Sequence, residues 1–89
     1  MTTSVARAAE SITSRQLELL QFLAKRQQMS VGDVAEALKV SSAAATKAIT
    51  RLERKGLVTR AVDVMDRRCI NVRLTRSGAE IARRSSGTD

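Results

Sequence analysis

The order of secondary-structure elements is decided by residues 31–74, which read VGDVAEALKVSSAAATKAITRLERKGLVTRAVDVMDRRCINVRL. Apolar side chains recur at three- and four-residue intervals over 31–38 and again over 42–55, a spacing that predicts two helices. Residues 39–40 leave room only for a tight connection between them. Gly56 follows the second helix, where its freedom to adopt a left-handed backbone favours a helix end. The stretch therefore opens as helix, turn and helix.

The remainder of the same stretch predicts a β-hairpin. Residues 57–62 and 68–74 are enriched in β-branched side chains, and apolar and polar positions alternate in the second segment. The turn between them, 63–67, contains no glycine, so we expect an open loop instead of a two-residue turn. A hairpin placed directly after two helices is typical of a winged helix-turn-helix.

Shorter helical patterns flank this stretch. Residues 14–27 predict a first helix, capped by Thr13 or Ser14. Its expected apolar face consists of Leu17, Leu20, Leu23 and Ala24, with Leu19 and Phe22 beside it. Residues 27–30 interrupt the pattern, and Thr75 can cap a short final helix. The predicted fold class is α+β, mostly α: a three-helix core plus a β-hairpin wing, with short terminal helices.

A chain of 89 residues has room for one domain only. We expect the winged helix-turn-helix domain to occupy residues 13–84, preceded by an extension over 1–12 and followed by a disordered tail over 85–89. The extension carries apolar residues at helical spacing, which predicts a short dimerisation helix. The residues of this possible dimer contact are Val5, Ala8, Ala9 and Ile12.

Composition excludes several classes of protein. The chain contains one cysteine and no histidine, so we expect no disulfide within a monomer, no metal site and no cofactor. No apolar run approaches the roughly 20 residues that span a bilayer, so we expect no membrane partner and a cytoplasmic location. The sequence also lacks a glycine-rich phosphate loop and a catalytic cluster, so we expect no enzyme activity.

The basic charge is concentrated in the second half of the chain. The formal net charge is +7, and residues 41–89 contain eleven basic and five acidic side chains, a net +6. A polyanion such as DNA suits this asymmetry, although a well-solvated surface would also explain it.

The helix over 42–55 presents a small, hydroxylated face opposite its core. The core positions are Ala45, Ala48, Ile49 and Leu52. The opposite face carries Ser42, Ala43, Thr46, Lys47 and Thr50. Small side chains let a helix enter the major groove of DNA, where hydroxyl and ammonium groups reach bases or phosphates. An ordinary solvated helix face explains the pattern equally well. We count Ser41, Arg51 and Arg60 as further candidates for phosphate contacts.

Arginines at the hairpin loop favour DNA more strongly. Arg67 and Arg68 stand beside Asp66, and Arg73 follows on the second strand. A narrow minor groove attracts arginine, and a carboxylate two residues away can orient the guanidinium through a bidentate pair. The alternative is a solvated hairpin tip whose charges pair incidentally.

These residues resemble a known family. Four segments, namely 31–38, 40–42, 51–60 and 63–78, look like the DNA-binding core of MarR-type transcriptional regulators. The most specific part is Asp66-Arg67-Arg68 followed by Leu74-Thr75 and Gly78, and the likeness spans about residues 12–81.

The resemblance implies a homodimer that binds a palindromic operator in double-stranded DNA, with repression as the expected outcome. It places Ser42, Ala43, Thr46 and Lys47 toward the major groove, and Arg68 in the minor groove with Asp66 orienting it. Members of the family carry long flanking helices that build the dimer interface and a pocket for small effectors. About a dozen residues precede the core here, and about as many follow Thr75, so we expect neither the usual interface nor a small-molecule effector.

Two further hypotheses concern the partner of the fold and the thiol of Cys69. A winged-helix module can also serve as a protein–protein adaptor without binding DNA, but an adaptor would not need arginines at the wing tip. Cys69 alternates with the apolar residues of its strand and is expected to point outward. Neighbouring arginines could then lower its pKa and make it a redox thiol, whereas a plain strand residue is the simpler interpretation.

Overall fold

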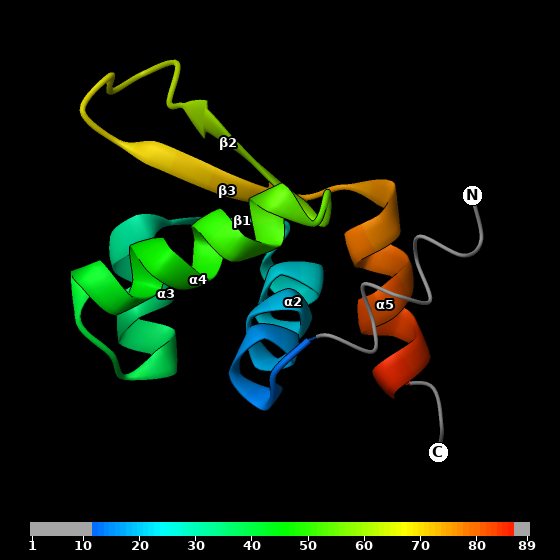
Figure 1. Cartoon of the computed structure of the whole chain (residues 1–89). Coiled ribbons are helices and arrows are strands. Elements are labelled where there is room, and N and C mark those ends of the chain that lie inside the picture. The colour runs from blue at the N-terminus through cyan, green and yellow to red at the C-terminus, as the bar shows by residue number, and fades with distance from the viewer. Residues whose placement is uncertain (1–11, 87–89) are drawn as a thin grey trace.

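The computed structural model describes residues 12–86, which form four helices and three strands (Figure 1). In chain order these are α2 (Ser14–Arg26), β1 (Gln28–Ser30), α3 (Val31–Leu38), α4 (Ser42–Arg54), β2 (Val58–Val62), β3 (Ile70–Leu74) and α5 (Arg76–Ser86). The order confirms the winged helix-turn-helix fold. None of the helices in this part of the chain is long and apolar enough to cross a membrane.

The three strands form one antiparallel sheet in the order β1-β3-β2. The hairpin of β2 and β3 was expected, but β1 was not, because residues 27–30 had been interpreted only as an interruption between helices. Met29 of β1 lies opposite Val72 of β3, and both side chains are buried. This short strand therefore attaches the wing to the helical part of the molecule, from which the hairpin projects beyond α3 and α4 (Figure 1).

The core is aliphatic and draws on every described helix. Its fully buried larger side chains are Leu19, Leu20, Leu23, Met29, Val34, Ile49, Leu52, Leu57, Val58 and Val72. On α2 the buried face differs from the expected one, since Leu19 is fully buried, Leu17 is only partly buried and Ala24 is exposed. Gln16 also faces inward, so α2 is rotated about its own axis relative to the predicted orientation.

Gln16 connects the start of α2 to the end of α4. Its side chain is 4% exposed, and its Oε1 atom accepts hydrogen bonds from the backbone N–H of Thr13 at 3.4 Å and from Nζ of Lys55 at 3.1 Å. The first bond completes a capping box with the Thr13 hydroxyl. One buried amide thus caps α2 and holds the C-terminal end of α4 in place.

A second junction joins α4, the sheet and α5. Gly56 adopts the left-handed backbone expected of it, with φ of 75°. The hydroxyl of Thr75 donates to the carbonyl oxygen of Gly56 at 2.7 Å and accepts from the backbone N–H of Gly78 at 3.1 Å, so Thr75 caps α5 as expected. The helix α5 continues to Ser86 and so includes the first two residues of the expected tail, and residues 87–89 lie outside the described part.

Gly78 should tolerate no side chain. A Cβ atom at this position would lie 2.0 Å from the backbone oxygen of Leu57, so Gly78→Ala should destabilise the fold by about 3 kcal/mol through overpacking. Gly32 is the matched control, since a Cβ there would meet only the Ser30 hydroxyl at 3.8 Å. Gly32→Ala should instead stabilise the protein by about 0.4–1 kcal/mol. Urea denaturation measures both changes, and equal midpoints for the two variants would contradict the packing described.

Candidate nucleic-acid interface

The face of α4 that was expected to meet DNA is exposed. Ala45, Ile49 and Leu52 are completely buried, so the helix presents its opposite face to solvent. Ser42, Ala43, Thr46 and Lys47 are exposed on that face, and Thr50 is partly buried. Ser41 caps the helix, and its hydroxyl accepts a hydrogen bond from the N–H of Ala44 at 3.1 Å. That hydroxyl can still donate to a phosphate while it serves the cap.

The two remaining candidates for phosphate contacts on the α4 side differ in their surroundings. Arg60 forms an ion pair with Glu53, with 2.9 Å between Nη2 and Oε1, and only 33% of the arginine side chain is exposed. This pair ties β2 to α4 and directs the guanidinium back toward the helix. Arg51 is exposed and lines a shallow hollow between α4 and the start of α2, which it shares with Lys47 and Arg15.

The wing loop is organised by the carboxylate of Asp63. Its Oδ1 atom accepts hydrogen bonds from the backbone N–H groups of Met65 at 2.7 Å and Asp66 at 3.1 Å, while Oδ2 accepts from the Asn71 amide at 2.9 Å. These bonds, led by that from Asn71, hold the pKa of Asp63 below its ordinary value. The backbone N–H of Asp63 also donates to the carbonyl oxygen of Cys69 at 2.9 Å. The expected open loop is therefore a hydrogen-bonded one.

Asp66 contacts Arg68, but not through the expected bidentate pair. One carboxylate atom, Oδ1, accepts from the backbone N–H of Arg68 at 3.1 Å and from Nε of the same residue at 3.3 Å. These bonds, the backbone one foremost, lower the pKa of Asp66. Because Nε makes the contact, the outer edge of the guanidinium faces solvent, and the Arg68 side chain is 92% exposed. The carboxylate thus orients Arg68 through Nε and leaves the two outer nitrogen atoms of the guanidinium exposed.

The surroundings of Cys69 do not favour the alternative of a more acidic redox thiol. The thiol is half-buried and donates to Oδ2 of Asp66 at 3.5 Å. This hydrogen bond, together with the nearby negative charge, raises the pKa of Cys69, and the smaller opposite effect of Arg68 does not compensate for it. Strand alternation missed the contact because Cys69 precedes β3 and lies in the loop.

Arg73 does not face the same way as the other candidate residues of the wing. It lies opposite Thr59 and Gln28 in the sheet, whereas Arg60 lies opposite Val72. Since neighbouring strand positions point to opposite faces, Arg73 and Arg60 occupy different sides of the sheet. Arg73 lines a hollow with Gln27 of the α2–β1 connection and Ala79 of α5. The structure therefore separates Arg73 from the wing tip and from α4.

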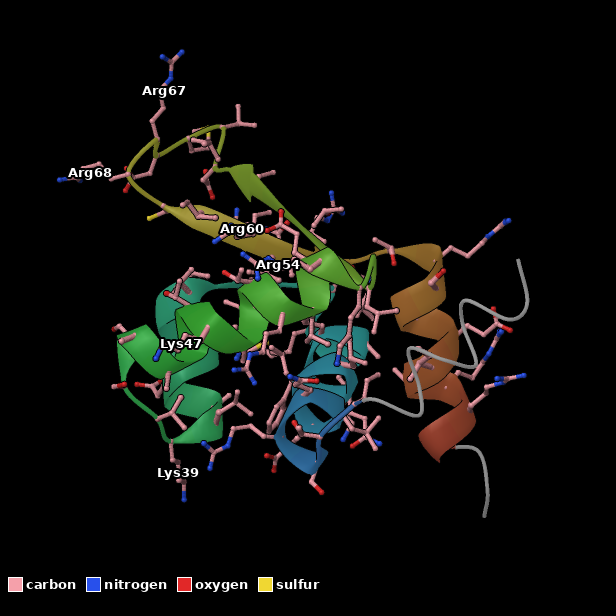
Figure 2. The ribbon with its side chains drawn as sticks, in the orientation of Figure 1. Lys39, Lys47, Arg54, Arg60, Arg67 and Arg68 are labelled. Carbon is pink, nitrogen blue, oxygen red and sulfur yellow. The ribbon has the colours of Figure 1, made fainter. Side chains whose placement is uncertain are left out.

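Six labelled basic residues lie over the helix-turn-helix and the wing (Figure 2). Figure 2 shows Lys39 at the turn between α3 and α4, Lys47 and Arg54 along α4, and Arg67 and Arg68 projecting from the wing tip. Sequence reasoning missed Lys39, Arg54 and Arg15 as candidates. Lys39 was seen only as part of a turn, yet its left-handed backbone, with φ of 58°, places it at the exposed corner of that turn.

The N-terminal candidates contribute nothing further here. Val5, Ala8 and Ala9 lie outside the described residues, and Ile12 packs partly buried against the core. Within residues 12–86 no group of three or more cysteine, aspartate or glutamate side chains is placed to hold a metal ion.

Comparison with known proteins identifies the family. A model of the MarR family matches residues 12–70. The chain belongs to the MarR family. It is 36% identical over 69 residues to the HTH-type transcriptional repressor MdtR of Bacillus subtilis, an alignment that covers 78% of this chain and 44% of MdtR. The chain thus spans under half the length of the curated relatives that it matches.

Solved structures agree with this assignment to the MarR family. S. aureus MepR in its complex with DNA superposes with a TM-score of 0.84 at 28% identity, covering 98% of this chain and 73% of MepR. Streptococcus pneumoniae FabT, also solved with DNA, gives 0.83 at 26% identity and covers 86% of this chain and 54% of FabT. The MarR family is one of transcriptional regulators and not of enzymes.

Asp66→Asn should make the Cys69 thiol more reactive. The variant removes the carboxylate that accepts a hydrogen bond from the thiol and disfavours the thiolate, so the pKa of Cys69 should fall toward its ordinary value. Alkylation by iodoacetamide at pH 8 should then be faster, because more thiolate is present. Glu80→Gln on α5 removes the same charge at a distance and should leave the rate unchanged. An unaltered rate in Asp66→Asn would show that the hydrogen bond does not control this thiol.

Proposed function

We propose that this chain binds double-stranded DNA and represses transcription, with α4 in the major groove and the wing in the minor groove. The observation that carries the proposal is the position of Lys47 on α4 and Arg68 on the wing, which both lie on the side of the molecule away from α5 (Figures 1 and 2). One α-helix fits the major groove of B-DNA, and an adjacent wing then meets the flanking minor groove.

The proposed roles follow from the surroundings of each side chain. Ser42, Ala43, Thr46 and Lys47 form the surface that enters the major groove, since they are exposed and Ala45 and Ile49 anchor the helix behind them. Arg68 supplies the minor-groove contact, because its guanidinium is oriented by Asp66 and otherwise exposed. Ser41, Arg51 and Lys39 are assigned to phosphates. Arg60 keeps its ion pair with Glu53 and holds the wing against α4.

We assign a homodimer and a palindromic operator to the same function. The relatives support DNA binding and repression and not the dimer: MdtR is a named transcriptional repressor, and MepR and FabT were solved with DNA. On α5, Ile81 and Ala82 are 3% and 2% exposed and pack in the core of the single chain. That Val5, Ala8 and Ala9 form the contact between protomers stays a prediction. The cytoplasmic location also stays a prediction.

Selection from a pool of random duplexes of about 30 base pairs tests the function, because that length holds two half-sites one helical turn apart. A repressor of the proposed kind should enrich an inverted repeat, and its affinity should fall steeply as salt rises. Sedimentation of the protein with the selected duplex gives the number of chains bound. Failure to retain any duplex at low salt would refute DNA binding and favour the adaptor hypothesis.

Arg68→Ala should weaken binding to the selected duplex by about 1–3 kcal/mol. The loss removes the guanidinium that Asp66 orients, whereas the fold should be unaffected because the side chain is 92% exposed. Arg84→Ala is the matched control, as it removes the same charge from α5, which lies across the molecule from α3 and α4 (Figure 1). Fluorescence anisotropy measures both affinities. An equal loss of affinity in the two variants would show that only net charge matters, and it would contradict the assignment of Arg68 to the minor groove.

A further inference from the structure

The wing exposes an unusual set of apolar side chains. Among the described residues, all the exposed large hydrophobic side chains lie on this hairpin: Val62, Val64, Met65 and Ile70. Val64 and Met65 are each 93% exposed, at the tip of the loop. Exposed apolar residues are common when they are scattered, but their confinement to one projecting element points to a contact surface.

The tip is held in a fixed shape although its side chains are exposed. The carboxylate of Asp63 accepts hydrogen bonds from the backbone N–H groups of Met65 and Asp66, which belong to the two peptide groups that flank Met65. The backbone between Asp63 and Cys69 is closed by a further bond from the Asp63 N–H to the Cys69 carbonyl oxygen. Because the loop is organised before binding, Val64 and Met65 can make a contact with little further loss of backbone entropy.

The charges next to this apolar tip indicate the kind of surface that it contacts. Arg67 and Arg68 follow Met65 after one residue, and both are exposed. The acidic groups of the loop, Asp63 and Asp66, are engaged by hydrogen bonds from the loop itself. An apolar tip beside two arginines fits a surface that is anionic along its edges and apolar between them. The minor groove of DNA has this character, because phosphates border walls made of deoxyribose C–H groups.

We propose that Val64 and Met65 pack against the deoxyribose walls of the minor groove, beside the guanidinium of Arg68. The inference rests on the proposed function and adds an apolar contribution to a contact otherwise made by charge. Val64 and Met65 expel water from the sugars, whereas Arg68 neutralises negative potential. The two contributions respond differently to salt, since only the neutralisation of phosphates releases counterions.

The test uses the double variant V64T/M65Q in the full chain with the selected duplex. Both substitutions keep the approximate side-chain size and remove apolar character. The loop should be preserved, because Asp63 binds two backbone N–H groups and the Asn71 amide and neither of the exchanged side chains. Affinity should fall about tenfold, with an unchanged dependence on salt. Calorimetry should show a less negative heat-capacity change of binding, the signature of a lost apolar contact.

Val62→Thr is the matched control, because Val62 is also exposed but lies on the stem of the hairpin. It should bind the duplex like the unmodified chain. A loss in Val62→Thr equal to that of the double variant would assign the effect to wing stability and overturn the proposal. Unchanged affinity in V64T/M65Q would overturn it as well.

Two further outcomes separate the possible failures. A change in the oligomeric state of V64T/M65Q without DNA would make the tip a protein contact and overturn the proposal. If the unmodified chain retains no duplex, the proposed function itself is wrong, and this result is obtained before any variant is measured. Binding by the unmodified chain with a salt-independent loss in V64T/M65Q supports the proposal.

Discussion

The structure depends on the pairing of β3 with a strand on each side. Val72 in the middle of β3 is fully buried, with Met29 of β1 opposite it on one side and Arg60 of β2 on the other. Without β1, the hairpin would be a two-stranded ribbon, which is marginally stable in water. The three residues of β1 therefore turn a projecting hairpin into part of the folded domain. They also fix the direction in which the wing leaves α3 and α4.

Two side-chain contacts hold α4 at its C-terminal end. Gln16 receives a hydrogen bond from Lys55 just beyond α4, and Glu53 in its last turn pairs with Arg60 of the sheet. The completely buried Ala45, Ile49 and Leu52 fix the helix from beneath. These contacts leave the outer face of the N-terminal half of α4 exposed, and they orient that face relative to the wing. A helix with an otherwise ordinary small and polar face becomes a candidate DNA reader through this placement.

The wing separates its charges by role. Its two aspartates bind loop N–H groups, and Asp66 also accepts from the Cys69 thiol, so both carboxylates stabilise the loop itself. Arg67 and Arg68 remain exposed at the tip. Acidic residues in a loop that faces DNA would repel the phosphates if they were free, whereas here hydrogen bonds to N–H groups offset their charge. The same arrangement explains why Cys69 is a weaker acid than its basic neighbours suggested.

The sequence by itself determined the helices α2, α3 and α4, the cap at Thr75, the left-handed Gly56 and the hairpin, because these follow from local spacing and backbone preferences. It also indicated which residues of α4 face outward. Only the tertiary structure decided that 28–30 form a strand, since three residues have no periodicity and pair only because β3 offers an open edge. The strand register set Arg73 apart from Arg60, and the reach of the hairpin beyond the helices left Ile70 40% exposed. Neither the register nor the reach is encoded locally, because both depend on which segments the folded chain brings together.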